Sequence, residues 1–335
     1  MVNIGIVGLG FMGQTHLKCY GKIPNAKVVS IADIDPRRVA GDLSGTWGNL
    51  GDGAGARVDT TGLFMTLSYK ELLARPEVQV VDVCVPTPVH HEITCAAVRA
   101  GKHVLCEKPL ARTAALAKEI ADLAAQSSQF CMPAMCMRFW PQWAWLKQAV
   151  AEQRYGNVRS AHFTRLSTPP PTWFGDGKMS GGAILDLHVH DTDFVNFLFG
   201  MPRSVFSRGY ASMTGEIDHV VTQYTFDGVP LVVAEGGWTM ASTFGFRMRY
   251  TVNFEKATAD FDLAREKQLM LYEEKSSQAV ECEAVDGWLA ELRYFVDCVQ
   301  HKRKPDLASF RDAERSIRIV EAERRSIQSG RAVEL

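Results

Sequence analysis

A short stretch near the middle of the chain carries the residue types that proton transfer from a hydroxyl group requires. Residues 182–193 read GAILDLHVHDTD, and if this stretch is helical, Asp186, His190 and Asp193 share one face. Oxidising a secondary alcohol needs a base that takes the hydroxyl proton, and histidine titrates near neutral pH. A neighbouring carboxylate orients the imidazole and stabilises its charged form. The spacing therefore favours His190 as a general base with an acidic neighbour.

A lysine lies directly after an expected strand, within Glu107-Lys108-Pro109. Ligands of parallel sheets bind outside the carboxyl ends of the strands, where a lysine can donate a hydrogen bond to a reacting oxygen. A surface lysine before a turn proline is an alternative that these three residues leave open.

A metal site is the rival interpretation of the histidines, because His188-Val189-His190-Asp191 is similar to the HxH of metal-dependent hydrolases. On a strand both rings would point the same way, as metal ligands must, whereas on a helix they lie about 200° apart. The apolar spacing of residues 184, 187, 194 and 198 favours the helix. We therefore predict no bound metal, and a packed or hydrogen-bonded His188 at the edge of the site.

A glycine-rich turn, GLGFMG at residues 8–13, directly follows an expected strand and precedes an expected helix. Gly8 suits the tight turn, Gly10 lets the backbone approach a pyrophosphate, and Gly13 allows the helix to pack closely on the strand. The pyrophosphate would face the free N–H groups of the helix N-terminus. In this context the motif predicts a dinucleotide-binding Rossmann domain.

Asp33 lies 20 residues past Gly13, at the end of the second expected strand. A carboxylate there can accept hydrogen bonds from the adenosine ribose and would repel a 2′-phosphate, so NAD is favoured. Arg37 and Arg38 follow closely, and NADP therefore remains possible.

The elements that must position these residues fall into two patterns. Up to about residue 125, β-branched runs alternate with helical stretches, which is typical of a doubly wound parallel sheet. Beyond it, strand-like runs joined by short turns indicate a mainly antiparallel sheet. The fold class is therefore α/β: a Rossmann domain over 1–125, followed over 126–335 by an α+β domain for substrate binding and oligomerisation, with a large open sheet. One helix is expected over 182–199, and residues 41–62 are expected to form a long glycine-rich surface loop of unassigned role.

The composition limits the possible partners. Lys and Arg number 37 against 38 Asp and Glu, so the net charge of −1 offers nucleic acid no basic surface, and no stretch suggests membrane binding. The eight cysteines form no CxxC pair, and the chain enters a strand at once without a leader-like pattern. We expect a cytoplasmic protein with a small-molecule substrate.

Taken together, the chain resembles the glucose–fructose oxidoreductase, inositol dehydrogenase and MocA (Gfo/Idh/MocA) family of NAD(P)-dependent oxidoreductases. The resemblance rests on the glycine-rich turn, on PTPVH at 86–90, on GKHVLCEKP at 101–109, on Arg138-Phe139 and on the stretch 181–193.

The resemblance implies roles for individual residues. Lys108 would be the catalytic lysine, Asp186 its acidic partner and His190 the proton acceptor, acting on a secondary alcohol of a sugar, cyclic polyol or related carbohydrate. It also implies a homodimer or homotetramer, and a Lys108–Pro109 bond that is often cis. The residues expected to line the cofactor are Gly8, Gly10, Phe11, Met12, Gly13, Asp33, Pro86, Thr87, Pro88, His90, Glu107 and Lys108.

The chain also departs from the family pattern in two places. The glycine-rich segment after the second strand is longer than usual, and His188 replaces a common glycine, which would reshape the substrate pocket. Arg165 and Trp173 lie where the family's substrate loop runs, although a structural ion pair would equally explain the arginine. A reductase, an enzyme that cycles a tightly bound cofactor, a dinucleotide-binding protein without turnover and a metal-dependent hydrolase remain alternatives.

Overall fold

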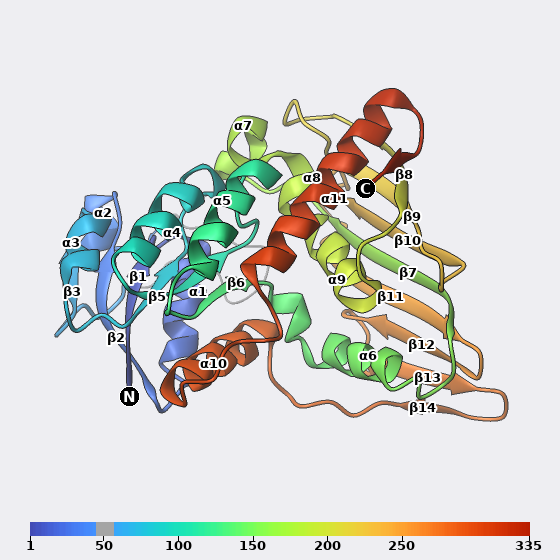
Figure 1. Ribbon diagram of the computed structural model, residues 1–335, viewed down its shortest axis with the longest axis horizontal. Helices are drawn as coiled ribbons and strands as arrows, with labels where there is room; N and C mark the ends of the chain where they lie inside the picture. The colour runs from blue at the N-terminus through green and yellow to red at the C-terminus, as the bar shows by residue number, and fades with distance from the viewer. Residues whose placement is uncertain (45–56) are drawn as a thin grey trace. The chain divides into compact units, whose positions relative to one another are not determined.

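The computed structural model describes residues 1–44 and 57–335, which form two compact units (Figure 1). The first unit contains Met1–Cys136 and Asp286–Glu314, and the second contains Met137–Val285 and Arg315–Leu335. The contacts thus group residues 126–136 and 286–314 with the N-terminal segment, whereas the sequence-based division at residue 125 assigns them to the second domain.

The first unit is built on a six-stranded parallel sheet in the order β3-β2-β1-β4-β5-β6. Its strands are β1 (Val2–Val7), β2 (Ala26–Ala32), β3 (Phe64–Thr66), β4 (Val80–Val83), β5 (His103–Glu107) and β6 (Cys131–Ala134). Its helices are α1 (Phe11–Tyr20), α2 (Pro36–Val39), α3 (Tyr69–Ala74), α4 (His90–Arg99), α5 (Ala114–Ala125) and α10 (Gly287–Gln300), with a 3₁₀ turn, η1 (Thr87–Val89).

This strand order confirms the predicted Rossmann sheet. The central strands are fully buried because helices on both faces leave no polar side for them, which explains their continuous apolar runs. The chain reverses its direction of winding between β1 and β4, and ligands of such sheets bind outside the strand ends at this point. The glycine-rich turn follows β1 there.

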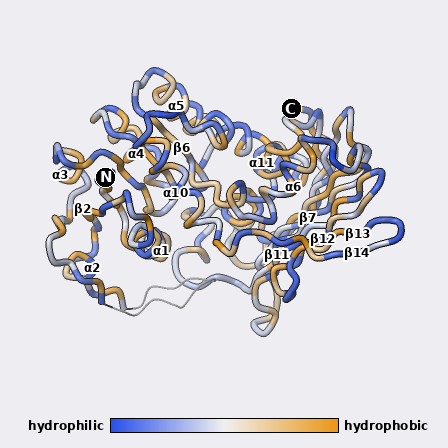
Figure 2. The backbone as a smooth tube through the Cα atoms, turned by 90° about the horizontal axis from the view of Figure 1, so that it is seen from below, coloured by the Kyte–Doolittle hydropathy of each residue, from blue (hydrophilic) through white to orange (hydrophobic). Residues whose placement is uncertain are grey.

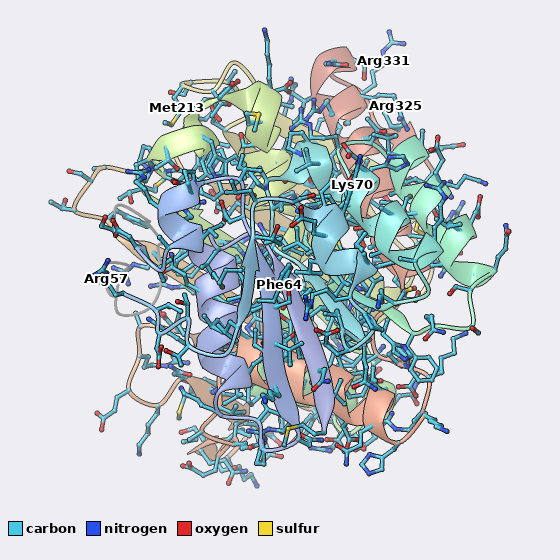
Figure 3. All side chains as sticks on the ribbon, turned by 90° about the vertical axis from the view of Figure 1, so that its left-hand side faces the viewer. Arg57, Phe64, Lys70, Met213, Arg325 and Arg331 are labelled. Atoms are coloured by element: carbon cyan, nitrogen blue, oxygen red, sulfur yellow. The ribbon has the colours of Figure 1, made fainter. Side chains whose placement is uncertain are left out.

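The short edge strand β3 was not expected from the sequence, because Phe64–Thr66 lies after the glycine-rich segment and is only three residues long. The guanidinium of Arg75 lies 4.0 Å from the centre of the Phe64 ring and so covers part of the edge. Figure 3 views the molecule from this side and labels Phe64. Of the expected loop over 41–62, residues 45–56 lie outside the described part of the chain; at its two flanks Asp42 and Arg57 form an isolated bridge.

The second unit contains a nine-stranded sheet in the order β14-β13-β12-β11-β7-β10-β9-β8-β15, in which only the β7–β10 pair is parallel. Its strands are β7 (Val158–Ser167), β8 (Ser204–Tyr210), β9 (His219–Thr225), β10 (Leu231–Gly237), β11 (Phe246–Phe254), β12 (Ala257–Asp262), β13 (Leu269–Glu273), β14 (Ser277–Ala279) and β15 (Val333–Glu334). The predicted open, mainly antiparallel sheet is confirmed; β13, β14 and β15 are additional to the expected strands.

Helices cover one face of this sheet, where alternate side chains of each strand are buried. They include α6 (Pro141–Ala151), α8 (Gly182–Asp186) and α9 (Val189–Phe199); α7 (Gly177–Ser180) precedes α8, and α11 (Phe310–Ser329) begins in the first unit and continues into the second. The core centres on Trp143. Its ring packs edge-to-face with the rings of Phe194 and Tyr250, with ring centres 4.7 and 5.3 Å apart. Hydrophobic and hydrophilic residues alternate along the tube in Figure 2, as expected for elements with one buried face.

Among the described residues, none of the helices combines the length and apolar character that crossing a lipid bilayer would need.

Candidate active site

The glycine-rich turn between β1 and α1 has the geometry that a bound pyrophosphate requires. Gly8 has a φ of +95°, and a Cβ there would lie 2.6 Å from the Cys84 carbonyl oxygen. A Cβ on Gly13 would lie 2.0 Å from the Gly8 carbonyl oxygen, so only glycine lets α1 start this close to the strand. A Cβ on Gly10 would meet nothing within 4 Å, which leaves the approach to the N-terminus of α1 open. The turn therefore fits a dinucleotide phosphate.

Asp33, directly after β2, is tied to this turn. Its Oδ2 accepts a hydrogen bond from the Leu9 N–H at 2.6 Å, and its Oδ1 accepts one from the Asp35 N–H at 2.8 Å. The guanidinium of Arg38 lies 3.4 Å from Oδ2. A carboxylate has about four acceptor positions, so Asp33 can hold the turn and still accept from a ribose hydroxyl. The sequence predicts the ribose role but not the support of the turn, which the structure adds.

Replacing Asp33 by asparagine is expected to lower the affinity for NADH and to raise the ratio of NADPH to NADH affinity by about tenfold or more. The amide keeps an oxygen for the Leu9 N–H, while the charge that repels a 2′-phosphate disappears and Arg38 loses its partner. The two dissociation constants are measured by cofactor fluorescence. Asp35→Asn is the control, since Asp35 pairs with Arg37; an unchanged ratio in Asp33→Asn would contradict the discriminating role.

The segment after β4 carries Pro86, Thr87 and Pro88, which start the turn η1, and His90, which starts α4. The His90 ring is 1% exposed, and its two nitrogens each lie 2.7 Å from a backbone carbonyl oxygen, one of Val85 and one of Pro109. Burial lowers the pKa of His90, although the two carbonyls favour the charged ring. The imidazole therefore holds together the chain segments that follow β4 and β5, and its place beside the cofactor stays a prediction.

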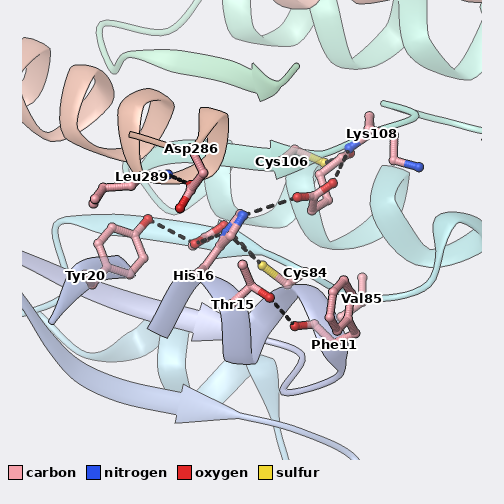
Figure 4. Close-up of polar contacts among 12 residues, drawn as sticks. Phe11, Thr15, His16, Tyr20, Cys84, Val85, Cys106, Lys108, Asp286 and Leu289 are labelled. Atoms are coloured by element: carbon pink, nitrogen blue, oxygen red, sulfur yellow. Dashed lines mark hydrogen bonds and ion pairs between the residues drawn. The ribbon is translucent and has the colours of Figure 1, made fainter. Parts of the chain in front are cut away.

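Lys108 follows β5 and is half-buried. Its backbone N–H donates to Oε2 of Glu107 at 3.0 Å, and the Lys108–Pro109 peptide bond is cis. Glu107 is 6% exposed, and its carboxylate therefore faces the interior of the first unit. In Figure 4 the side chain of Lys108 points away from the buried polar residues around His16.

A buried polar cluster behind the turn was missed by the sequence analysis. His16 of α1 lies with its Nδ1 2.8 Å from Oδ2 of Asp82, and its Nε2 lies 3.2 Å from Oε1 of Glu107, at ion-pair distance but without the alignment of a hydrogen bond. Tyr20 and Cys84 also donate to Asp82, at 2.9 and 3.3 Å (Figure 4). Burial disfavours the charged ring of His16, but the charges and hydrogen bonds of Asp82 and Cys84 together outweigh it and raise the pKa well above its usual range. The one signal in the sequence was an aspartate inside the apolar run VVDVCV.

In the second unit, the stretch expected as one helix over 182–199 is interrupted. Helix α8 ends at Asp186 and α9 begins at Val189, and the N–H groups of Leu187 and His188 both donate to the Ala183 carbonyl. Asp186 is 8% exposed and His190 is half-buried in the first turn of α9. The regular i, i+4, i+7 face predicted from the sequence is therefore wrong in detail, because the two short helices meet at a break.

Asp193 does not support His190. Both of its carboxylate oxygens lie 2.8 Å from the Arg138 guanidinium, and Oδ1 also accepts from the Ser316 hydroxyl at 2.8 Å. Arg138 and Asp193 are both almost fully buried. A bidentate pair of this kind leaves the carboxylate no free edge, so Asp193 is a structural residue.

The three residues considered for substrate contact have other partners in the structure. His188 is fully buried, with Nε2 3.3 Å from the Tyr224 hydroxyl, and Arg165 is 3% exposed and bidentate to Asp191 at 2.7 and 3.2 Å. Both residues thus have the structural partners that the sequence analysis left open as alternatives, and their contact with a substrate stays a prediction. Trp173 is half-buried and stacks on Phe174 at 4.0 Å.

Comparisons with known proteins agree with this fold and turn geometry. Residues 2–135 match the family model described as "Oxidoreductase family, NAD-binding Rossmann fold", and residues 143–260 match the "GFO/IDH/MocA C-terminal domain". These two matches correspond to the two sheets of the structure, and together they span most of the chain.

Named relatives align over long stretches at low identity. The myo-inositol 2-dehydrogenase of Thermotoga maritima is 25% identical over 354 aligned positions, covering 100% of this chain and 98% of that protein. The levoglucosan dehydrogenase of Pseudarthrobacter phenanthrenivorans is 30% identical over 206 positions, covering 59% of this chain and 51% of that protein.

A solved structure of levoglucosan dehydrogenase in complex with NADH and levoglucosan superimposes with a TM-score of 0.86 at 21% identity, covering 99% of each chain, which establishes the shared fold. The predictions of fold class, family and NAD as cofactor are confirmed. The chain belongs to the Gfo/Idh/MocA family of oxidoreductases with an NAD-binding Rossmann domain.

Proposed function

We propose that this protein oxidises a secondary alcohol of a sugar or cyclic polyol to a ketone, reversibly and with NAD. The observation that carries the proposal is the glycine-rich turn fitted to a dinucleotide, followed along the sheet by a half-buried lysine directly after β5. The relatives named as inositol and levoglucosan dehydrogenases support a polyhydroxylated ring as the substrate class.

Three residues carry the proposed chemistry. The turn of Gly8, Gly10 and Gly13 would hold NAD, which when bound would supply the hydride acceptor for the carbinol carbon. Lys108 donates a hydrogen bond to the substrate oxygen and stabilises the negative charge that develops on it. His190 takes the hydroxyl proton, and Asp186 is the acidic partner of Lys108. Glu107 and His90 fix the backbone on either side of Lys108.

The test is an initial-rate assay of NADH formation with myo-inositol, levoglucosan and a wider panel of sugars and polyols, run with NAD and with NADP. Turnover of at least one ring polyol with NAD is the expected result. NADH binding without turnover of any alcohol in the panel would contradict the proposed reaction.

We also propose that the protein is a homo-oligomer that associates through the face of the nine-stranded sheet opposite α8 and α9. The strand register places Phe206, Val221 and Leu231 on this face, separated by polar residues such as Gln223, and they are 38%, 39% and 44% exposed. Exposed apolar side chains on three adjacent strands are typical of a surface that another subunit covers.

Replacing Val221 by lysine is therefore expected to shift the protein to monomers without unfolding it, as measured by analytical ultracentrifugation. Leu67→Lys, which makes the same kind of change at an exposed apolar residue of the first unit, is the control and should leave the association unchanged. A wild-type monomer at micromolar concentration would contradict the oligomer.

We also propose a cytoplasmic location, because all eight cysteines are free thiols in the structure and cytoplasmic proteins keep their thiols reduced.

A further inference from the structure

Glu291 on α10 is a fully buried acid whose two carboxyl oxygens have no hydrogen-bond partner among the described residues. Helix α10 comes from near the end of the chain and packs against α1, behind the glycine-rich turn. Figure 4 shows the start of α10, with Asp286 and Leu289, beside His16 and Tyr20 of α1. A carboxylate oxygen of Glu291, a ring nitrogen of His16 and a carboxylate oxygen of Glu107 all lie within 4.8 Å of one another.

The charges around this carboxyl group do not balance if all acids are ionised. Among the described ion pairs, Asp82 and Glu107 each contact only His16, and Glu291 contacts no cation. The titratable groups that face Glu291 are His16, Cys19 and Tyr20 of α1, Asp82 of β4, Glu107 of β5, and Asp286 before α10. One imidazolium among three buried carboxylates would leave a net charge of −2, and each uncompensated buried charge costs several kcal/mol.

A proton on Glu291 reduces this net charge from −2 to −1. Burial, and next the nearby Glu107 carboxylate, raise the pKa of Glu291 well above its usual range. With Glu291 neutral and His16 charged, the imidazolium lies between Asp82 and Glu107 and serves both.

Glu107 connects this cluster to Lys108. Its Oε1 lies 3.2 Å from His16, and its Oε2 accepts the Lys108 backbone N–H at 3.0 Å. An ionised Glu291 would repel the Glu107 carboxylate and compete with it for His16. The conformation of the peptide that carries Lys108 therefore depends on the side chain at position 291 and on its charge.

We infer that Glu291, as a neutral acid, is a positioning residue that acts through His16 and Glu107 on Lys108. The part of this inference that concerns catalysis rests on the proposed function, because it takes Lys108 as the catalytic lysine. The charge state of Glu291 is independent of that assumption and is measured on the folded protein alone.

The first test compares the pH dependence of stability in the wild type and in Glu291→Gln, whose amide has the shape of the protonated acid. The folded state holds a proton on Glu291 that the unfolded chain releases above about pH 4.3, so this contribution is fully present at low pH and is lost as pH rises. Between pH 5 and 8 the unfolding equilibrium of the wild type should shift toward the unfolded state by up to about tenfold per pH unit relative to Glu291→Gln.

Glu314→Gln is the matched control, because Glu314 is a buried acid of the same unit with an arginine, Arg311, 3.5 Å away. Its stability difference from the wild type should not grow with pH in this way. A Glu291→Gln difference that is constant from pH 5 to 8 would overturn the inference. So would a stoichiometric divalent metal in the purified protein that Glu291→Gln loses, since Glu291 would then be an ionised ligand.

The second test uses turnover and separates positioning from bulk stability. Glu291→Ala should lower kcat about tenfold with little change in KM, and glutamine at the same position should restore most of it. The alkaline decline of kcat in the wild type should move to higher pH in Glu291→Gln. If turnover is found but neither effect occurs, the positioning role fails alone; if the wild type oxidises no alcohol, the proposed function fails while the stability test still decides the charge state.

Discussion

Replacing His190 by alanine is expected to lower kcat by about 10²–10⁴-fold, the usual loss when a general base is removed. The imidazole is proposed to take the hydroxyl proton as the hydride leaves, so the lost interaction belongs to the transition state and KM should change little. His190 is half-buried at the start of α9 and is not among the buried hydrophobic residues of the core. The measurement is a steady-state assay with the best substrate of the wild type.

The control for this variant is His91→Ala. His91 lies on α4 and pairs with Glu119 at the surface, so its loss should leave kcat unchanged. A His190→Ala enzyme with kcat within about threefold of the wild type would contradict the role of His190 as the base.

The second large effect concerns the glycine-rich turn. In Gly13→Ala the new methyl group would lie 2.0 Å from the Gly8 carbonyl oxygen and 3.0 Å from its carbon, and both of these are backbone atoms that cannot rotate away. Either α1 moves off the strand or the turn opens. We expect a loss of stability of about 3 kcal/mol, measured by thermal unfolding. We also expect a loss of NADH binding, measured by fluorescence titration.

Gly10→Ala separates binding from folding at the same turn. Nothing lies within 4 Å of a Cβ at Gly10, and its φ of −74° suits alanine, so the free protein should keep its stability. The methyl group would occupy the approach that the pyrophosphate needs, and NADH binding should weaken severely. Wild-type affinity for NADH in Gly10→Ala would show that the phosphate does not bind at this turn.

The Rossmann part of the fold was predictable because its signals are local. Glycine spacing, the continuous apolar strands and Asp33 at the end of β2 all lie within short stretches, and the parallel sheet follows from their order. The division of the chain at residue 125 places helix α10 in the second domain, whereas the contacts group it with the first unit. The sequence gives no sign of this, because the contact of α10 with α1 joins segments more than 260 residues apart. The hydrophobic face of a helix predicts burial but not the partner that buries it.

The same limit explains why the sequence did not reveal the partners of the candidate site residues. Arg165 and His188 suited a substrate pocket, and Asp193 suited an acidic neighbour of His190. In the structure Asp191, Tyr224 and Arg138 on other elements pair with them. Glu291 is one of two acids on the amphipathic helix α10, and only its burial beside His16 and Glu107 distinguishes it. Hydrogen-bond partners are tertiary facts, which a single sequence does not contain.

The most direct test of the central claim follows the hydride itself. The protein is incubated with NAD and a ring polyol carrying deuterium on the carbinol carbon, and both products are analysed by mass spectrometry. The account predicts that deuterium appears in the reduced cofactor in an amount equal to the ketone formed, and that His190→Ala forms both far more slowly. Ketone without deuterium in the cofactor, or neither product although NADH binds, would contradict NAD-dependent alcohol oxidation.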